Sequence, residues 1–440
     1  MRLLMFLFFC LTVGILTAQM NKIDYVEYDL DNGLHVILHQ DASTPIVAVS
    51  VMYHVGSKNE KPDRTGFAHF FEHLLFEGSE NIGRGEYDEY VESAGGTLNA
   101  NTTYDRTFYY EILPSNQTEL GLWLESERML HAIVENTGIE TQREVVKEER
   151  RLRVENRPYG TIVQEAMKRA YKKHPYQWPV IGYMEHLNAA EEADYKNFYN
   201  DFYVPNNAVL SLAGDIDIAQ TKLWIEKYFG SIPKGTKPIY RPTIVEGPID
   251  GEIRDTIYDN IQLPAVVQAY RIPAQGTDDF YAVSLLSTLL SQGGSSRLNK
   301  SLVDDQQLAL FVGAFPFELE DPGVSLAFAI CNAGQDPSTV EAAMDAEIVK
   351  VQTELISDEE FQKLKNQVEN DFISGNARVA GIAESLANYH MYFGDANLIN
   401  TEIDRYLSVT KEDIMAAANK YFSKDSRVVL YYLPKPTATP

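Results

Sequence analysis

The residues best suited to chemistry lie close together between positions 66 and 76. His69 and His73 are four positions apart. On a helix they lie one turn apart on the same face, so both imidazoles can reach one metal ion. Glu72 borders that face, where its carboxylate can act as a general base without being a ligand. The order H-x-x-E-H inverts the zinc-binding H-E-x-x-H pattern, so we predict a metal site here.

A catalytic zinc site needs a third protein ligand and one open coordination position. The candidates lie in residues 142–150, a predicted helix that contains Glu144, Glu148 and Glu149. Each offers a suitable carboxylate, and spacing alone does not choose among them. The alternative is that the two histidines are only packed or capped on an apolar face, because H-x-x-E-H strings also arise by chance.

Other ionisable residues are weaker candidates. Glu77 continues the stripe of His69 and His73, but it lies about 12 Å along the helix axis from His69. We therefore expect Glu77 to be a solvated charge at the helix end. We expect the remaining histidines to be scattered structural or surface residues: His35, His39, His54, His131, His174, His186 and His390.

The order of predicted elements indicates an α+β domain that occurs twice. In the first half, residues 46–55 form a Val-rich strand ahead of the helix that carries the motif. The second half repeats this order with a strand at 265–272 and a helix at 281–291. We expect two tandem homologous domains, each a mainly antiparallel β-sheet with helices packed on one face. Two unrelated α+β domains are the alternative.

The boundary between the halves is predicted from composition. Residues 232–251 are rich in proline and glycine and show no clear period, which is typical of a linker. We predict an N-terminal metal-binding domain over residues 19–240 and a C-terminal domain without a metal site over residues 241–435. Residues 436–440 are predicted to be a disordered tail.

The N-terminus has the pattern of a secretory signal peptide. Arg2 is followed by an apolar run over residues 3–16 and by Ala18, and the run is shorter than the ~20 residues that a spanning helix needs. We predict a signal peptide over residues 1–18, no stable membrane span after its cleavage, and export, with the periplasm as destination. An uncleaved N-terminal anchor is the alternative.

Composition excludes several classes of protein. The 440 residues carry 38 Lys and Arg against 63 Asp and Glu, a net charge of −25, which disfavours binding to nucleic acid. A hydrophobic content of 45% excludes wholesale disorder. The only cysteines are Cys10 and Cys331, too few for a disulfide framework or a cysteine-rich zinc module.

An ordered series of motifs resembles the pitrilysin / mitochondrial processing peptidase family of zinc metallopeptidases. The resemblance covers nearly the whole chain after the predicted signal peptide. Its motifs occupy residues 54–57, 66–78, 95–100, 142–149, 174–176, 181–182, 203–207, 213–215 and 293–298, and the third of them is followed by Thr102, Asp105, Thr107 and Tyr109.

The resemblance implies one zinc ion per chain and chooses among the glutamates. Glu149 stands 76 residues after His73, which is the family's spacing for the third ligand, so the implied ligands are His69, His73 and Glu149 with Glu72 as general base. The family usually has a glutamate seven residues before the third ligand, where this chain has Gln142. We expect Gln142 to alter the electrostatics around the ligands without loss of zinc.

The resemblance also suggests how substrate binds. Residues 98–103 resemble the family's edge strand for substrate, and an extended peptide can add to such an edge through main-chain hydrogen bonds. Asn99 and Ala100 are the predicted substrate-binding residues.

The second half departs from the pattern of active members. These need an Arg and a Tyr, seven residues apart, near the substrate, and this chain has Val303 and Leu310 there. In two-subunit members a zinc-less homologue carries the Arg/Tyr pair. We therefore expect a heterodimer with such a subunit; a homodimer is the alternative.

The expected function is that of a zinc metalloendopeptidase subunit that hydrolyses peptides or unfolded segments. The alternative is a non-catalytic binding or assembly subunit of the same fold, since core proteins of a respiratory complex share this fold without being peptidases.

Overall fold

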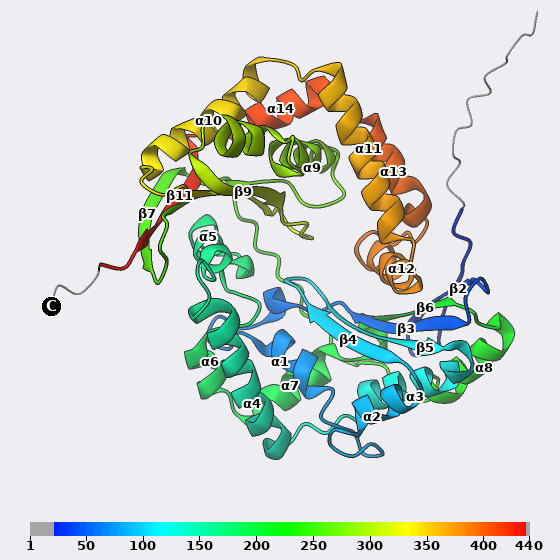
Figure 1. Ribbon diagram of the computed structural model, residues 1–440. Coiled ribbons are helices and arrows are strands. Elements are labelled where there is room, and N and C mark those ends of the chain that lie inside the picture. The colour runs from blue at the N-terminus through cyan, green and yellow to red at the C-terminus, as the bar shows by residue number, and fades with distance from the viewer. Residues whose placement is uncertain (1–21, 437–440) are drawn as a thin grey trace, which may run out of the picture.

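The structure is a computed structural model that describes residues 22–436. The predicted signal peptide, residues 1–18, lies outside the described residues, and so does the predicted tail after residue 436. Figure 1 shows two α+β halves that face one another, the first in blue to green and the second in green to red. Among the described residues, no helix is long and apolar enough to cross a membrane.

The first sheet has six strands in the order β1-β2-β6-β3-β5-β4. Neighbouring strands are antiparallel except β2 and β6, which are parallel. The strands are β1 (Val26–Asp29), β2 (His35–Gln40), β3 (Ile46–Tyr53), β4 (Thr97–Thr102), β5 (Thr107–Pro114) and β6 (Ala208–Gly214). Because β4 ends the order, one side of this strand has no neighbour in the sheet.

Helices of the first half cover one face of this sheet. Apolar side chains from several helices join those of the strands in one core, among them Phe67, Phe71, Leu122, Phe198 and Ile225. The helices are α1 (Phe67–Leu74), α2 (Glu86–Ser93), α3 (Thr118–Leu130), α4 (Asn136–Arg150), α5 (Ile162–Ala170), α6 (Met184–Ala189), α7 (Glu192–Phe202) and α8 (Ile218–Phe229).

The second sheet repeats the arrangement of the first. Its order is β7-β11-β8-β10-β9, with one parallel pair, β7 and β11, and antiparallel pairs elsewhere. Its strands are β7 (Gly251–Asp259), β8 (Ala265–Arg271), β9 (Ala309–Pro316), β10 (Val324–Cys331) and β11 (Ser426–Pro434). The order matches β2-β6-β3-β5-β4 strand for strand, so the prediction of a repeated α+β fold is confirmed.

Helices of the second half cover one face of the second sheet in the same way. Their core includes Leu286 and Leu290 from α9, Met344 from α10 and Ile414 from α14. The helices are α9 (Asp278–Ser291), α10 (Pro337–Thr353), α11 (Asp358–Gly375), α12 (Val379–Phe393), α13 (Leu398–Ser408) and α14 (Lys411–Tyr421). Within the described chain, residues 231–250 between α8 and β7 form neither helix nor strand.

The halves exchange one helix each across their interface (Figure 1). From the first half, α5 packs its Ala166 and Met167 against Val267 and Leu430 of the second sheet. Each sheet therefore has helices of its own half on one face and a helix of the other half on the opposite face, an addition to the predicted architecture.

The reciprocal contact is made by α12. Its Ile382 and Leu386 pack against Ala48 and Val209, which lie on the face of the first sheet opposite the helices of its own half. This explains why β3 is buried along nearly its whole length. A strand covered on both faces requires a near-continuous apolar sequence.

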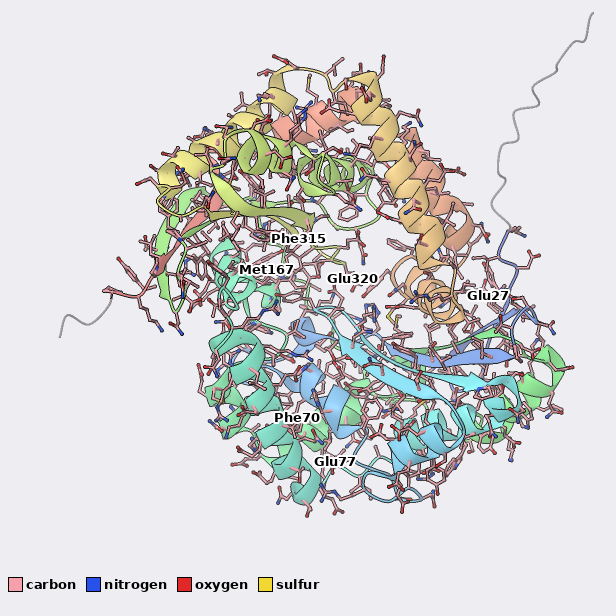
Figure 2. The ribbon with its side chains drawn as sticks, in the orientation of Figure 1. Glu27, Phe70, Glu77, Met167, Phe315 and Glu320 are labelled. Atoms are coloured by element: carbon pink, nitrogen blue, oxygen red, sulfur yellow. The ribbon has the colours of Figure 1, made fainter. Side chains whose placement is uncertain are left out.

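A buried ionic network also joins the halves. The Lys58 side chain is only 3% exposed, and its Nζ lies 2.9 Å from Asp105 Oδ1 and 2.5 Å from Glu320 Oε2. His54 Nε2 lies 2.8 Å from the same Glu320 oxygen. Glu320 belongs to the second half and lies between the two halves (Figure 2), so its carboxylate ties the first half to the second.

Candidate metal centre

The helix that carries H-x-x-E-H is fixed at its N-terminus by a buried carboxylate. Glu60 is 4% exposed, and its two oxygens accept hydrogen bonds from the amides of Gly66, at 2.8 Å, and Ala68, at 2.9 Å. Burial raises the pKa of Glu60 well above its ordinary value, while these amide bonds oppose the rise. Gly66 has φ +92° and approaches the Ile181 carbonyl so closely that a Cβ would clash. The backbone that leads into α1 is therefore held in one conformation.

The C-terminal end of α1 is held by side chains from β5 and α3. Tyr109 donates its hydroxyl to the Phe71 carbonyl at 2.8 Å, and Arg128 donates Nη1 to the Leu75 carbonyl at 2.8 Å. Arg128 is fully buried and forms ion pairs with Glu125 and Glu111. Burial, with Glu125 close by, raises the pKa of Glu111 well above its ordinary value. Both ends of the helix are thus held by hydrogen bonds to other segments of the first half.

Three of the predicted site residues converge between α1 and α4. Glu149 Oε2 lies 3.4 Å from His69 Nε2 and 3.1 Å from His73 Nε2. One donor atom from each residue lies within 4.8 Å of the other two. The imidazole planes are inclined at 68°, so their lone pairs approach a shared point from different directions.

The electrostatics of this group fit a divalent cation. Burial, and then His73, lower the pKa of His69 to about 4, which leaves a neutral imidazole with a free lone pair near pH 7. Burial opposes ionisation of Glu149, yet the neighbouring His73, His69 and Arg153 hold the pKa of its carboxyl below its ordinary value. Glu149 Oε2 is buried and has no hydrogen-bond partner among the described residues. Two imidazoles and an anionic oxygen are ligands that zinc prefers.

Glu72 lies beside this group but outside it. Thr102 on β4 donates its hydroxyl to Glu72 Oε2 at 2.6 Å. Burial raises the pKa of Glu72, and the Thr102 bond and His73 oppose the rise. A carboxylate with a raised pKa is a stronger proton acceptor than a free one, so this position suits a general base.

Thr102 and Arg153 are site residues that sequence reasoning missed. Arg153, in the short helix η3 (Arg151–Glu155), places Nη1 2.7 Å from Glu149 Oε1. This contact engages the carboxylate oxygen that does not face the histidines. The signal for Arg153 is its spacing, one helical turn after Glu149. Thr102 is among the residues that carry the family resemblance, but its contact with Glu72 depends on the packing of β4 against α1.

The predicted substrate-binding residues lie on the open edge of the sheet. Asn99 is exposed on β4 and Ala100 is partly buried. The Asn99 side-chain oxygen accepts a hydrogen bond from the Ala100 amide at 2.8 Å. Both residues pair with β5 on one side only, which leaves main-chain groups of β4 available to an added strand.

Gln142 and Glu77 form a pair that the sequence analysis did not anticipate. Gln142 Nε2 donates to Glu77 Oε1 at 2.6 Å, and Arg84 Nε donates to Glu77 Oε2 at 2.6 Å. The Glu77 side chain is only 12% exposed, so the expectation of a solvated end charge is wrong. Helix α1 ends before Glu77, and the chain turns this carboxylate towards α4. Gln142 therefore bonds Glu77 rather than a ligand.

The expectation of scattered histidines is also wrong in part. His54, His131 and His174 each pair with a carboxylate. His35 and His390, however, come from different halves and stack on one another. Because they are more than 350 residues apart along the chain, no local sequence pattern predicts this contact.

The equivalent region of the second half has no such group. Helix α9 contains neither histidine nor glutamate and contributes apolar side chains to the second core. Val303 lies partly buried in η6 (Asn299–Asp305), and Leu310 is 60% exposed on β9. Helix α9, which corresponds to α1, therefore carries no counterpart of His69, Glu72 and His73.

Comparison with known proteins identifies the family. The zinc protease PqqE of Helicobacter pylori is 31% identical over 412 residues, which cover 92% of each chain. Residues 35–182 match the model of the insulinase family, peptidase family M16, and residues 190–368 match that of the M16 inactive domain. The chain belongs to peptidase family M16. The predicted resemblance to the pitrilysin group is therefore confirmed.

Other M16 relatives share nearly the whole length. The uncharacterized zinc protease YmxG of Bacillus subtilis is 23% identical and covers 92% of this chain and 97% of its own. The crystal structure of a protease from Helicobacter pylori has a TM-score of 0.90 at 30% identity, covering 94% of this chain and 100% of that one.

Two more distant M16 structures share the fold. The M16 inactive domain from Pseudomonas fluorescens has a TM-score of 0.83 at 18% identity and covers 95% of this chain and 100% of that one. The first half of the periplasmic protease PqqL from Escherichia coli has a TM-score of 0.75 at 20% identity, covering 94% and 92%.

Proposed function

We propose that this chain is the zinc-carrying subunit of a metalloendopeptidase that hydrolyses peptides or unfolded segments. The observation that carries the proposal is the convergence of His69, His73 and Glu149 beside Glu72. The bond from Thr102 to Glu72 supports it further, because it links the general base directly to the open edge of β4.

In this proposal His69, His73 and Glu149 hold one zinc ion. When bound, zinc supplies Lewis acidity, which polarises a carbonyl and lowers the pKa of a coordinated water. Arg153 holds Glu149 by its other oxygen and so fixes the orientation of the carboxylate towards the histidines.

The remaining steps belong to the chain's own residues. A peptide adds to the edge of β4 by main-chain hydrogen bonds around Asn99 and Ala100, which aligns its carbonyl groups with the site. Glu72 takes the proton of the attacking water and returns it to the leaving amine. Thr102 keeps Glu72 Oε2 in one orientation, so the other oxygen is left to exchange the proton.

We also propose the organisation and location predicted above: domains over residues 19–240 and 241–435, a cleaved signal peptide, and a periplasmic protein. The description of PqqL as a periplasmic protease supports this location. We further propose that the active enzyme is a heterodimer with a zinc-less homologous subunit that supplies an Arg/Tyr pair. This chain has Val303 and Leu310 at the positions of the pair, which supports the need for a partner that carries it.

The decisive experiment compares wild type with Glu72→Gln in a peptide-cleavage assay, with the partner subunit present. We expect a 10²- to 10⁴-fold loss of turnover with zinc retained at His69, His73 and Glu149, and loss of wild-type activity in a chelator. Glu89→Gln, the same change at an exposed position on α2, is the matched control. Chelator-resistant turnover, or full activity in Glu72→Gln, would overturn the proposal.

The heterodimer has a separate test. Peptide cleavage by this chain alone is compared with cleavage by an equimolar mixture with a zinc-less homologue encoded in the same genome. We expect turnover in the mixture to exceed that of the lone chain at least tenfold. Equal rates would leave the peptidase proposal standing and reject the heterodimer.

A further inference from the structure

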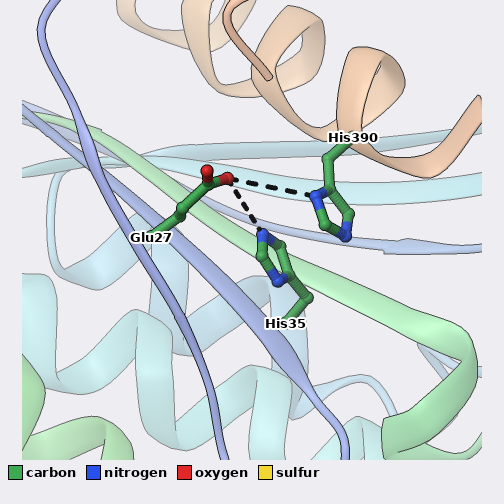
Figure 3. A group of neighbouring side chains, drawn as sticks. All are labelled: Glu27, His35 and His390. Atoms are coloured by element: carbon green, nitrogen blue, oxygen red, sulfur yellow. Dashed lines mark hydrogen bonds and ion pairs between the residues drawn. The ribbon is translucent and has the colours of Figure 1, made fainter. Parts of the chain in front are cut away.

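A second group of two histidines and a carboxylate lies where the halves meet, away from the candidate metal centre. Glu27 and His35 come from neighbouring strands β1 and β2 of the first half, and His390 comes from α12 of the second (Figure 3). One donor atom from each residue lies within 4.8 Å of the other two. Glu27 and His390 lie outside both regions matched by the family models.

The Glu27 carboxylate is the common partner of both imidazoles. Its Oε2 lies 3.3 Å from His35 Nε2 and 4.0 Å from His390 Nδ1, and Figure 3 shows both nitrogens directed at that oxygen. The side chains of His35 and His390 are 12% and 27% exposed, and that of Glu27 is 42% exposed. The group is therefore sheltered by the two halves but open to solvent on the Glu27 side.

A fourth residue orients the group. Asp29 Oδ1 lies 2.8 Å from His35 Nδ1, so in the neutral imidazole Nδ1 carries the proton and donates it to Asp29. In that tautomer His35 Nε2 directs a lone pair towards Glu27, and a cation between the two atoms could bind both. A carboxylate behind a histidine, fixing the tautomer that leaves the other nitrogen free, is the usual support of a metal-ligating histidine.

The close stacking of His35 on His390 also limits how much positive charge the two rings can carry together. Their centroids are 3.3 Å apart and their planes differ by 8°, so two imidazolium ions would repel each other strongly at this separation. A single cation shared by the ring nitrogens and Glu27 avoids that repulsion and neutralises the carboxylates.

We propose that Glu27, His35 and His390 bind a divalent transition-metal ion of the zinc class, which links the first half of the chain to the second. Donors on one tetrahedral zinc ion are about 3.4 Å apart; here Glu27 Oε2 lies 3.3 Å from His35 Nε2 and 4.0 Å from His390 Nδ1, so the side chains would have to move only a little. The His390 ring turns out of the stack to direct its lone pair at the ion, while Asp29 keeps the His35 ring in place. This rotation about χ2 is cheap, because that torsion has a broad energy well. Water completes the coordination on the exposed side.

The site is tested by metal content of the full-length protein after equilibration with Zn²⁺ and removal of free metal. We expect two equivalents in wild type and one in His390→Gln. The double variant His69→Gln/His73→Gln should also retain one, because it keeps the Glu27 group intact. His131→Gln is the matched control, since His131 pairs with a single carboxylate, Glu80, at 3.0 Å, and it should keep two equivalents.

A second readout needs no peptidase activity. Co²⁺ replaces Zn²⁺ and gives visible absorption bands in a tetrahedral site, so the double variant should show these bands and lose them on addition of Glu27→Gln. Zn²⁺ should raise the thermal midpoint of the double variant but not that of the triple variant. Equal metal content in wild type and His390→Gln, or a double variant without zinc, would overturn the proposal and leave the proposed peptidase function untouched.

Discussion

The two halves have the same strand order but differ in the helix that corresponds between them. In the first half, α1 is eight residues long, exposes part of Glu72 and His73, and depends on buried Glu60 for its start. In the second half, α9 is fourteen residues long and is held by apolar packing around Leu286. The same sheet thus supports a candidate metal site beside α1 in one copy and an apolar core beside α9 in the other, so the fold does not specify the chemistry.

Each half also has an arginine that is almost fully buried among carboxylates, Arg128 in the first half and Arg427 in the second, with a different result. Arg128 pairs with Glu125 and Glu111 and donates to the end of α1. In the second half, Arg427 on β11 places Nη1 2.6 Å from Asp345 and Nη2 2.9 Å from Glu341, both on α10. The first arginine holds the end of the helix that carries the candidate metal ligands, while the second ties α10 and β7 to β11.

Among the changes that test the difference between the two halves, Leu286→Ala is expected to have the largest effect. Leu286 is fully buried on α9, so its truncation should lower the free energy of unfolding by about 2–5 kcal/mol. Zinc content of the folded protein should stay unchanged, because no ligand comes from this half in the proposed catalytic site. Chemical denaturation and metal analysis measure the two quantities.

The control for that change is Leu223→Ala on α8, where the side chain is 66% exposed. Its free energy of unfolding should stay within about 0.5 kcal/mol of wild type. If folded Leu286→Ala lost zinc from the proposed catalytic site, packing in the second half would also control metal binding in the first, contrary to this prediction.

A smaller effect is expected at the contact between the halves. Burial opposes the charge of Glu320, but His54 and Lys58 lower its pKa to about 2. A lowered folded pKa stabilises the protein above the unfolded value near 4.5, and that stability is lost as pH falls from about 4.5 towards 2. Glu320→Gln should cost about 1–3 kcal/mol at pH 7.

Denaturation of wild type and Glu320→Gln at several pH values measures this effect. The difference between the two proteins should shrink as the pH falls below about 4.5. A difference that stays constant down to pH 2 would contradict the assigned role of the Glu320 charge.

The next effect tests the link between β4 and the general base. Thr102→Val keeps the shape of the side chain and removes the bond to Glu72, so turnover should fall about tenfold, which corresponds to about 1.4 kcal/mol. Thr97→Val, on the same strand at an exposed position, should leave turnover unchanged. Equal rates in wild type and Thr102→Val would mean that Glu72 needs no orientation from the edge strand.

The smallest effect is expected from Gln142→Glu, which restores the family's usual residue. The new carboxylate would face Glu77, so we expect a stability change within about 1 kcal/mol, because Arg84 already pairs with Glu77. Zinc should remain at one equivalent in the proposed catalytic site. A loss of that zinc, seen by metal analysis, would assign Gln142 a direct part in holding the ligands.

The sequence was most informative where the determinants are local. The i, i+4 spacing of His69 and His73 required only one helical turn, and the structure brings them together. Glu149 could not be chosen from spacing, because Glu144 and Glu148 share its helix. Only the family resemblance selected Glu149, the one of the three that faces α1.

The features that the sequence did not reveal depend on contacts between distant segments. Thr102 meets Glu72 because β4 lies beside α1, and Glu77 meets Gln142 because α4 packs near the end of α1. His35 and His390 meet only because α12 crosses to the first sheet. None of these has a period or a motif, so no local pattern could predict them.

The exchange of α5 and α12 has a consequence for how the chain can be divided. If the backbone were cut between α8 and β7, the two fragments would still share the interfaces of Met167 and Leu386 with the opposite sheets. Each fragment alone would expose an apolar sheet face and an apolar helix, a combination that favours aggregation. Co-expressed, the same surfaces would make the fragments reassemble, so this chain is suited to use as a split protein.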